Sequence, residues 1–346
     1  MRALIKHHPG EGLAFTNDRP TPEIGPRDVL VRVSKAGICG TDRHIWQWDE
    51  WAAGRIPVGI VTGHEFVGVV EAVGEAVTAV KPGQRVSAEG HMTKGTDYLS
   101  RTGNAHIARD TQIFGIDRDG CFADFISVPE SNVWPVHPDI PDRFAAIFDP
   151  LGNAVHTVME AGVSAKSVLI SGVGIIGLMA VTVARAAGAA RIYATDVNPP
   201  RLELARKLGA TAAFDASNEP DWIKEVRRET RGEGVDVLLE MSGAEPAIDQ
   251  GFQALRNGGR AALLGLPAKP VTFDFNDNII FKGCTVLGIN GRRMWETWYQ
   301  MEQLLLSGRL DLDDIVTHEY PLEQFETAFE TMISGRGIKV LLGING

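Results

Sequence analysis

One glycine pattern limits what this chain can fold into more than any other feature. Gly172, Gly174 and Gly177 form G-x-G-x-x-G between the apolar run SVLIS and the Ala-rich run IIGLMAVTVARAAGA. Between a strand and a helix, this spacing permits a tight turn, a close approach of the backbone to a pyrophosphate and close helix–strand packing. The unpaired N–H groups and the dipole of the helix N-terminus favour the anion. We therefore predict a dinucleotide-binding unit rather than a glycine-rich turn that binds nothing.

An acidic residue at the end of the next predicted strand bears on the choice of dinucleotide. Asp196 ends the run RIYATD, downstream of the glycine pattern. A carboxylate at this position accepts hydrogen bonds from the adenosine ribose and repels a 2′-phosphate, which predicts NAD rather than NADP. Arg201 follows shortly after, and it has two interpretations: it lies over the adenine, or it belongs to a solvated helix face.

The pattern of residues along the chain changes near residue 150. From residue 151 to 290, strand and helix patterns alternate, which predicts a doubly wound parallel sheet. Residues 1–150 consist of short Val-, Gly- and Pro-rich runs such as DVLVRVSKAGI, typical of a barrel-like all-β domain. A chain of 346 residues is long enough for two such domains. The final run KVLLGI is a predicted strand that returns to the first domain.

Composition and charge exclude several classes of partner. The net charge is −10 and no basic stripe is present to neutralise phosphates, which argues against nucleic acid. No apolar stretch is long enough for a signal peptide or a membrane span. Cys39, Cys121 and Cys284 are few, odd in number and far apart, as expected in a reducing compartment. We predict a cytoplasmic protein that binds neither nucleic acid nor membrane.

Two short segments of the first half together fit a metal site. GICGTD contains Cys39, and TGHEFVG contains His64 and Glu65. Zinc accepts a thiolate, an imidazole and a carboxylate, and a catalytic zinc site leaves one position open for water or substrate. Taken separately, each segment has a simpler interpretation, because an isolated cysteine is often a small buried residue and a His–Glu pair is often a surface pair.

In combination, these motifs resemble a known enzyme family over essentially the whole chain. GICGTD, GHEFVGVVEAVGEAV, KPGQRV, GCFADF and the glycine pattern occur in the order found in zinc-dependent medium-chain dehydrogenases/reductases. The resemblance implies an α/β protein with a GroES-like β-barrel catalytic domain, made of residues 1–150 and 291–346, and a Rossmann NAD-binding domain at residues 151–290.

Other segments narrow the resemblance to one activity. HIWQWDEW, EGHMT, DPLGNAVHTV and GRRMWETWY are similar to the members that oxidise L-threonine to 2-amino-3-oxobutanoate. One alternative is a polyol, sugar-alcohol or 2,3-diol dehydrogenase of the same family. A second alternative is a non-catalytic dinucleotide-binding protein that retains the fold.

The resemblance also assigns a metal site. Cys39, His64 and Glu65 match the ligands of one catalytic zinc. Asp149 matches an acidic position in or near the coordination sphere, where it binds zinc either directly or through water. Zinc is a Lewis acid that lowers the pKa of a bound alcohol and stabilises the alkoxide.

Further roles follow from the same resemblance. Thr41 and His44 match a hydroxyl and an imidazole that carry the alcohol proton to water, and His91 is expected to line the substrate pocket. The positions that match contacts to NAD are Gly172, Gly174, Ile176, Gly177, Asp196, Arg201, Leu264, Gly265, Leu266, Ile289 and Asn290. For the last five, an ordinary strand end is the alternative.

One segment departs from the family pattern. After GHMT, the relatives usually carry four cysteines that bind a structural zinc, and the matching positions here are Lys94, Asp97, Ser100 and Ala108. These side chains provide no tetrahedral thiolate site. We predict one zinc per chain, and a loop from about residue 91 to 110 held by packing, hydrogen bonds or a subunit contact.

Two further expectations concern substrate and assembly. The ammonium and carboxylate of threonine require polar partners, for which QWDEW offers Asp49 and Glu50, and EGHMT offers Glu89 and His91. For any one of these acids, a solvated surface position is the simpler interpretation. The run GCTVLGIN is apolar at a predicted sheet edge, which favours pairing with another copy in a homo-oligomer, either a dimer or a tetramer.

Overall fold

The computed structural model describes residues 1–345 and divides the chain into two compact units. The first unit contains residues 1–149 and 316–345, and the second contains residues 150–315. Gly346, the last residue of the segment predicted to complete the first domain, lies outside the described residues. No helix in the described part of the chain is long and apolar enough to cross a membrane.

The chain returns to the first unit later than the sequence predicts. Residues 291–315 belong to the second unit, because the segment before helix α10 (Glu296–Leu306) is bonded to helix α5 (Phe148–Ala161). Arg292 Nη1 lies 3.3 Å from Asn153 Oδ1, and Arg293 Nη1 lies 3.5 Å from the Glu160 carboxylate. The side chain of Arg292 is buried against Gly152, where a Cβ would overlap its aliphatic part.

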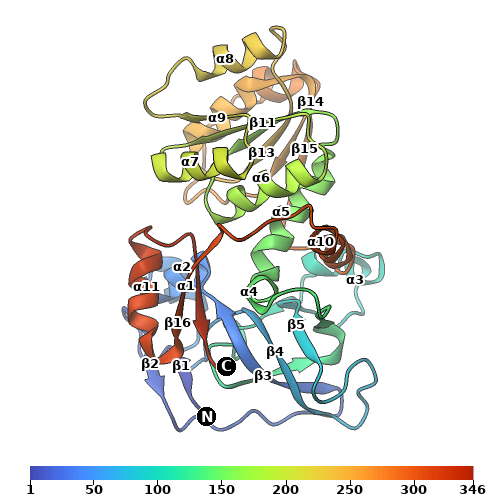
Figure 1. The fold of residues 1–346 in the computed structure, drawn as a ribbon, viewed down its shortest axis with the longest axis vertical. Helices are drawn as coiled ribbons and strands as arrows, with labels where there is room; N and C mark the ends of the chain where they lie inside the picture. Colours follow the sequence, from blue (N-terminus) through green and yellow to red (C-terminus); the bar gives the residue numbers. More distant parts are fainter. Residues whose placement is uncertain (346) are drawn as a thin grey trace. The chain divides into compact units, whose positions relative to one another are not determined.

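The second unit is built on one parallel sheet, which confirms the predicted Rossmann class (Figure 1). Its strand order is β12-β11-β10-β13-β14-β15, and every neighbouring pair is parallel. The strands are β10 (Ser167–Ser171), β11 (Arg191–Asp196), β12 (Ala212–Asp215), β13 (Val235–Glu240), β14 (Leu255–Leu263) and β15 (Thr285–Gly288). Besides α5 and α10, the helices are α6 (Ile175–Ala186), α7 (Pro199–Leu208), α8 (Trp222–Glu229), α9 (Glu245–Ala254) and a short π-helical turn at Asn276–Ile280.

The strand order reverses beside β10. From β10 the chain proceeds to β11 and β12 on one side, and later to β13, β14 and β15 on the other. In such sheets, ligands bind outside the carboxyl ends of the strands at the point of reversal. The sequence dictates this burial: β10 is apolar on both faces, and α6 is buried from Gly177 to Ala184.

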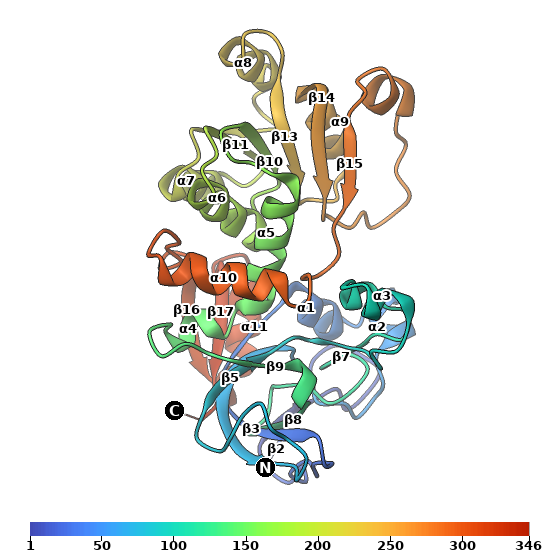
Figure 2. The same ribbon diagram turned by 90° about the vertical axis from the view of Figure 1, so that its right-hand side faces the viewer.

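The first unit is mainly β-structure and contains a seven-stranded sheet, but it also contains helices that the all-β prediction did not include (Figure 2). The order is β16-β17-β3-β4-β5-β9, and β8 also pairs with β3. The strands of the unit are β1 (Ala3–Ile5), β2 (Ala14–Thr16), β3 (Asp28–Gly37), β4 (Glu65–Val73), β5 (Arg85–Ala88), β6 (His91–Met92), β7 (Gln112–Ile113), β8 (Phe125–Pro129), β9 (Val133–Pro135), β16 (Val316–Pro321) and β17 (Lys339–Gly343). Its helices are α1 (Gly40–Gln47), α2 (Glu50–Arg55), α3 (Tyr98–Arg101), α4 (Asp142–Ala145) and α11 (Phe325–Ile333), with short turns at Ala105–Ile107, Glu130–Asn132 and Leu322–Gln324.

Strand register brings three distant segments of the first unit together. Gly37, at the end of β3, pairs with Glu65 at the start of β4 and with Leu341 of β17. A Cβ on Gly37 would overlap the Glu65 carboxylate, so a residue without a side chain is needed here. The chain from Gly37 into Cys39 therefore begins beside the His64–Glu65 segment.

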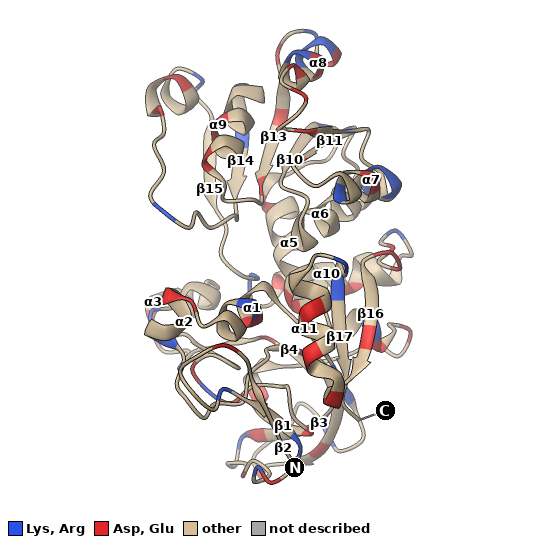
Figure 3. Cartoon of the chain, turned by 90° about the vertical axis from the view of Figure 1, so that its left-hand side faces the viewer, with Lys and Arg blue, Asp and Glu red and all other residues tan. Residues whose placement is uncertain are grey.

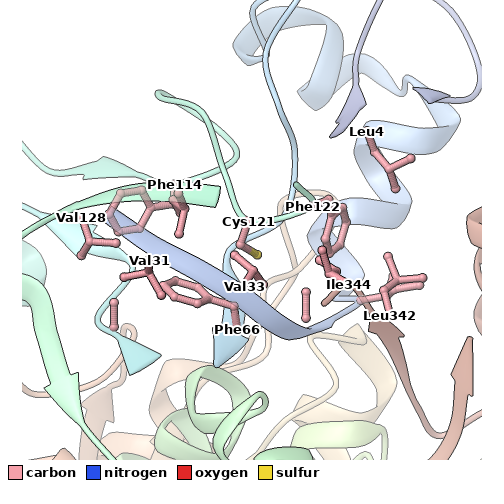
Figure 4. Packing of buried hydrophobic residues seen from close by; sticks show 14 of the residues in the cluster. Leu4, Val31, Val33, Phe66, Phe114, Cys121, Phe122, Val128, Leu342 and Ile344 are labelled. Carbon is pink, nitrogen blue, oxygen red and sulfur yellow. The ribbon is translucent and has the colours of Figure 1, made fainter. Parts of the chain in front are cut away.

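The strands that meet at this junction also contribute to the hydrophobic core of the first unit (Figure 4). Val31 and Val33 of β3 pack in the same cluster as Phe66 of β4 and Leu342 of β17, and all four are at most 2% exposed. Cys121 is fully buried in the cluster, and its thiol donates to the backbone carbonyl of Glu65 (3.5 Å). Core packing and sheet register thus determine where the polar residues at the strand ends lie.

Charged residues are spread over both units. In Figure 3, Lys and Arg positions are interspersed with Asp and Glu positions, and acidic positions are prominent on α11. The ion pairs on the surface include Lys207–Asp314, Lys224–Asp221 and Arg206–Glu203. Exposed pairs of this kind contribute little to stability individually.

Candidate metal centre and dinucleotide-binding edge

Three predicted metal ligands meet in the first unit. One ligand atom each of Cys39, His64 and Glu65 lies within 4.8 Å of the others. Within residues 1–345, these three form the group of His, Cys, Asp or Glu side chains close enough together to hold a metal ion. His64 and Glu65 are 6% and 1% exposed. Sulfur, nitrogen and oxygen donors in this combination fit zinc.

Several buried polar atoms at this cluster lack hydrogen-bond partners. This observation tests whether the residues fit a bound metal ion. His64 Nδ1, Glu65 Oε1 and Asp42 Oδ1 are buried and have no hydrogen-bond partner within the described residues. Buried polar atoms in folded proteins are nearly always paired, and leaving one unpaired costs about 1–3 kcal/mol. The donor set and the unpaired atoms together fit a bound cation.

Helix α1 positions the cysteine. Cys39 is the N-cap of α1, and its backbone N–H donates to Asp42 Oδ2 (2.9 Å), as in a capping box. The sulfur therefore lies at the N-terminus of α1, beside the first backbone N–H groups of the helix. The Cys39 sulfur also contacts the hydroxyl of Thr41, with Sγ and Oγ1 3.8 Å apart.

A buried lysine from the C-terminal strand completes the surroundings of Glu65. Lys339 is 1% exposed, and its Nζ lies 2.5 Å from Glu65 Oε2 and donates to the carbonyl of Ile38 (2.8 Å). Burial disfavours the charge on Lys339, but Glu65 and Cys39 outweigh this effect and raise its pKa. Lys339 ties β17 to both ligand-bearing segments.

The electrostatic field of the cluster favours a positive charge. Burial lowers the pKa of His64, but the charges of Cys39, Asp42 and Asp149 outweigh it and raise that pKa to about 10. Burial raises the pKa of the Asp42 carboxyl to about 6, although His64 and the Cys39 N–H act in the opposite direction. A divalent cation bound to the imidazole would use the same field that otherwise holds a proton.

Asp149 and His91 do not belong to the group formed by Cys39, His64 and Glu65. Asp149, on the first turn of α5, acts on His64 through its charge, but its carboxylate is not among the atoms clustered within 4.8 Å. His91, on β6, has its Nδ1 2.7 Å from Glu89 Oε1, and its backbone N–H donates to the same oxygen (3.0 Å). Asn132 bonds the carbonyls of both residues, so this Glu–His pair is held rigidly.

The predicted relay residues lie on α1. Thr41 and His44 are three residues apart and therefore share one face of the helix. His44 Nδ1 lies 2.5 Å from Asp49 Oδ2. Asp49, which the sequence offers as a partner for the substrate ammonium, is thus engaged by His44, and its second oxygen accepts from Ala52 N–H (3.0 Å).

The loop without the four cysteines is held by hydrogen bonds. Asp97 caps α3 by accepting from Leu99 N–H (2.8 Å) and Ser100 N–H (3.2 Å), and it also accepts from the Ser100 hydroxyl (2.5 Å). Thr93 and Ser100 join their hydroxyls at 3.1 Å, and Lys94 N–H donates to Asp110 (3.1 Å). Positions 97 and 100, which match two of the family's cysteines, therefore bond to each other.

In the second unit, the glycine pattern has the predicted conformation. Gly172 has φ +87°, and a Cβ there would overlap Ser242. Gly174 is the N-cap of α6 and faces open space, whereas a Cβ on Gly177 would overlap the carbonyl of Gly172. These are the three properties expected for a turn, a phosphate approach and close helix packing.

Asp196 lies directly beside the glycine turn. Its Oδ2 accepts from Val173 N–H (2.8 Å), and its Oδ1 accepts from Val197 N–H (2.8 Å) and Asn198 N–H (3.0 Å). The carboxylate at the end of β11 therefore stabilises the turn and is fixed in place. Arg201 lies on the first turn of α7, where its backbone N–H donates to Asn198 Oδ1.

The remaining predicted NAD contacts lie at the carboxyl ends of the same parallel strands. Ile176 is on the first turn of α6, Ile289 and Asn290 follow β15, and residues 264–266 follow β14. Leu264 and Gly265 donate their N–H groups to the carbonyl of Glu240, and Leu266 is 90% exposed. Sheet topology thus gathers these segments at one edge.

Three residues of these sites were missed by the sequence reasoning. Asp42 and Lys339 surround the metal cluster, and Glu240 is a buried carboxylate that accepts from the N–H groups of Ser242 (3.0 Å) and Gly243 (3.1 Å) at the end of β13. A Cys-x-x-Asp capping pattern was a usable signal for Asp42, and an acid at a strand end was a usable signal for Glu240. Lys339 had no local signal, because its partners lie about 300 positions earlier in the chain.

Comparison with known proteins agrees with this geometry. The family description "Alcohol dehydrogenase GroES-like domain" matches residues 25–139, and "Zinc-binding dehydrogenase" matches residues 176–307. An L-threonine 3-dehydrogenase of Symbiobacterium thermophilum is 48% identical over 343 residues, covering 99% of this chain and 97% of the relative.

Solved structures have the same fold over the full length. An alcohol dehydrogenase from Thermus sp. ATN1 superposes with a TM-score of 0.90 at 33% identity and covers 100% of both chains. A protein of Sinorhizobium meliloti 1021 described as a zinc-binding dehydrogenase, in complex with NADP, has a TM-score of 0.88 at 28% identity, covering 99% of this chain and 98% of that one.

Proposed function

Because this chain belongs to the zinc-binding dehydrogenases, we propose that it oxidises the hydroxyl of L-threonine, transfers the hydride to NAD and yields 2-amino-3-oxobutanoate. The observation that carries the proposal is the buried Cys39–His64–Glu65 cluster with its unpaired polar atoms, in a chain 48% identical to an L-threonine 3-dehydrogenase. Intact ligands and an intact glycine turn argue against a non-catalytic protein.

In the proposed mechanism, Cys39, His64 and Glu65 would hold one zinc ion. When bound, zinc supplies Lewis acidity that lowers the pKa of the substrate alcohol. Asp149 tunes the site through its charge, either as a further ligand or through water. Thr41 and His44 receive the alcohol proton from the metal site and pass it to solvent, and Lys339 orients the Glu65 carboxylate.

We assign the cofactor as NAD rather than NADP on the strength of Asp196. A ribose 2′-phosphate at this position would approach a fixed carboxylate, whereas a 2′-hydroxyl would donate to it. Gly172, Gly174, Ile176 and Gly177 would hold the pyrophosphate at the N-terminus of α6. Leu264, Gly265, Leu266, Ile289 and Asn290 would contact the rest of the cofactor, and Arg201 the adenine.

The substrate proposal draws on the Glu89–His91 pair. Glu89 is fully buried and holds His91 by two hydrogen bonds, and burying a carboxylate is costly unless it has such partners. A carboxylate–imidazole pair of this kind suits an amino-acid substrate with its own ammonium and carboxylate. A polyol or 2,3-diol, the alternative substrate class, offers only hydroxyl groups.

We further propose a homo-oligomer in the cytoplasm. Strand β15 is an edge strand of the second unit's sheet, and the exposed Phe275, Ile280 and Phe281 precede it in the chain. An uncovered edge next to apolar side chains favours pairing with a second copy. A dimer is the smallest assembly that covers it, and light scattering at micromolar concentration tests it.

The decisive experiment follows NADH formation with L-threonine, 2,3-butanediol and sorbitol, with and without added zinc. We expect the highest kcat/KM for threonine, and activity that depends on zinc. A clear preference for butanediol or sorbitol would contradict the substrate while leaving the metal mechanism intact. Zinc-independent turnover would contradict the mechanism itself.

A further inference from the structure

The polypeptide after helix α1 reverses direction in an unusual way. Trp48, the C-cap of α1, has φ 52° and ψ 46°, a left-handed conformation that is costly for a bulky residue. Asp49 follows and caps α2 through Ala52 N–H (3.0 Å). The reversal places the Asp49 carboxylate over the last turn of α1, where His44 lies.

A buried lysine holds this reversal in place. Lys6 has no exposed surface, and its Nζ donates to the carbonyls of Gly12 (2.9 Å) and Ile45 (2.8 Å), and lies 4.7 Å from the centre of the Trp48 ring. Bonds to charged donors and a desolvated cation–π contact are both stronger than their neutral counterparts. The left-handed Trp48 is therefore fixed by its surroundings rather than by its own preference.

These contacts fix the His44 imidazole on its Nδ1 side. Asp49 Oδ2 lies 2.5 Å from His44 Nδ1, and the ring of Trp51 meets the His44 ring edge-on with centres 6.1 Å apart. A carboxylate accepts hydrogen bonds and does not donate them, so Nδ1 must carry a proton. In the neutral ring, the lone pair is then on Nε2. The His44 side chain is 55% exposed, so water can remove a proton from it.

We propose that Asp49 is a positioning residue that sets the tautomer of His44, so that Nε2 is the atom that accepts the relayed proton. Nε2 binds the proton coming from the metal site and later releases it to water, while Nδ1 keeps its own proton throughout. Asp49 remains ionised and orients the ring, as the carboxylate does in a catalytic triad. This inference rests on the proposed function, because the role of His44 belongs to that proposal.

The test uses Asp49→Asn in the full-length, zinc-loaded protein. Asn keeps an oxygen for the α2 cap but presents an NH₂ group to Nδ1, which favours the opposite tautomer. We expect ¹⁵N NMR of histidine-labelled protein to show Nδ1–H in the wild type and Nε2–H in the variant. We also expect kcat to fall about 10- to 100-fold, with the KM for NAD and the zinc content unchanged.

Further variants separate positioning from general damage. Asp49→Ser retains a cap for α2 but is too short to reach His44, and it should show the same loss of kcat with a mixture of tautomers. Glu71→Gln removes one exposed acid elsewhere on β4 and should match the wild type in every measurement. In a His44→Ala background, Asp49→Asn should have no further effect on kcat, because the two residues act as one unit.

The outcomes distinguish this inference from the proposed function. An unchanged His44 tautomer in Asp49→Asn, or an equal loss of kcat in the His44→Ala background, would overturn the role of Asp49. If the wild type oxidised none of the alcohols, the proposed function would fail, while the NMR measurement would still decide whether Asp49 sets the tautomer.

Discussion

The metal cluster and the loop at residues 91–110 differ in how their polar side chains are satisfied. In the cluster, three ligands from two separated segments meet in a buried place and leave polar atoms unpaired. In the loop, the residues at the positions of the family's cysteines bond to near neighbours, as Asp97 does with Ser100. Unpaired buried polar atoms fit a bound cation, whereas a loop with local hydrogen bonds needs none.

The metal cluster and the loop differ in how far each depends on a metal ion. A site assembled by tertiary structure depends on its ion, because three charged or polar side chains share one small volume. A loop that is capped and bonded locally depends only on its own sequence. We therefore expect one zinc per chain, bound at Cys39, His64 and Glu65. Metal analysis that found two tightly bound zinc ions per chain would contradict this expectation.

The largest expected effect comes from Cys39→Ser. Loss of the thiolate should remove zinc and lower kcat at least about 1,000-fold, because alkoxide stabilisation is lost with the ion. Metal analysis and NADH formation measure the two effects. Cys284→Ser, which alters a thiol of the second unit, is the matched control and should retain both zinc and turnover. Full activity of Cys39→Ser would refute the metal mechanism.

Removal of zinc by a chelator should destabilise one region and spare the other. We expect the first unit to lose several kcal/mol, about 4 if zinc was present at 1,000 times its Kd. Hydrogen exchange should accelerate at residues 38–42 and 64–66 but not at residues 91–110. Equal acceleration in the loop would mean that the loop also depends on metal.

A carboxylate of the second unit offers a contrast that involves no metal. Asp196→Asn keeps one oxygen for the glycine turn but removes the negative charge, so NADP should be tolerated better. We expect the ratio of kcat/KM for NAD over NADP to fall about 10- to 100-fold, which corresponds to about 1.4–2.7 kcal/mol. Asp215→Asn, at the end of the neighbouring strand β12, is the control. Equal use of both cofactors by the wild type would remove the basis of the assignment.

The smallest effect is expected in the loop. Asp97→Ala removes the cap of α3 and should cost about 1 kcal/mol locally, seen as about fivefold faster hydrogen exchange at residues 98–102. Zinc content and kcat should not change. Asp139→Ala removes an exposed acid elsewhere and should leave exchange in the loop unaltered. Loss of zinc from Asp97→Ala would show that the metal cluster depends on the loop, contrary to this expectation.

Local sequence was sufficient where the deciding interactions are local. The glycine turn, the strand-ending Asp196 and the alternation of strands and helices were predicted because the spacing of Gly172, Gly174 and Gly177 encodes one backbone geometry. The return of β17 to the first unit was predicted from an apolar run. The boundary at residue 315 was not, because it depends on Arg292 and Arg293 bonding to α5.

What the sequence by itself determined is the set of chemical groups: a thiolate, an imidazole and a carboxylate in two short motifs, and a phosphate-binding turn. Only the tertiary structure decided how they meet. Strand register places Gly37 beside Glu65, and β17 brings Lys339 to the same carboxylate. The left-handed Trp48 turns Asp49 toward His44 rather than toward a substrate. The physical reason is that residue spacing encodes local geometry, whereas register, core packing and chain reversal depend on contacts between residues far apart in the chain.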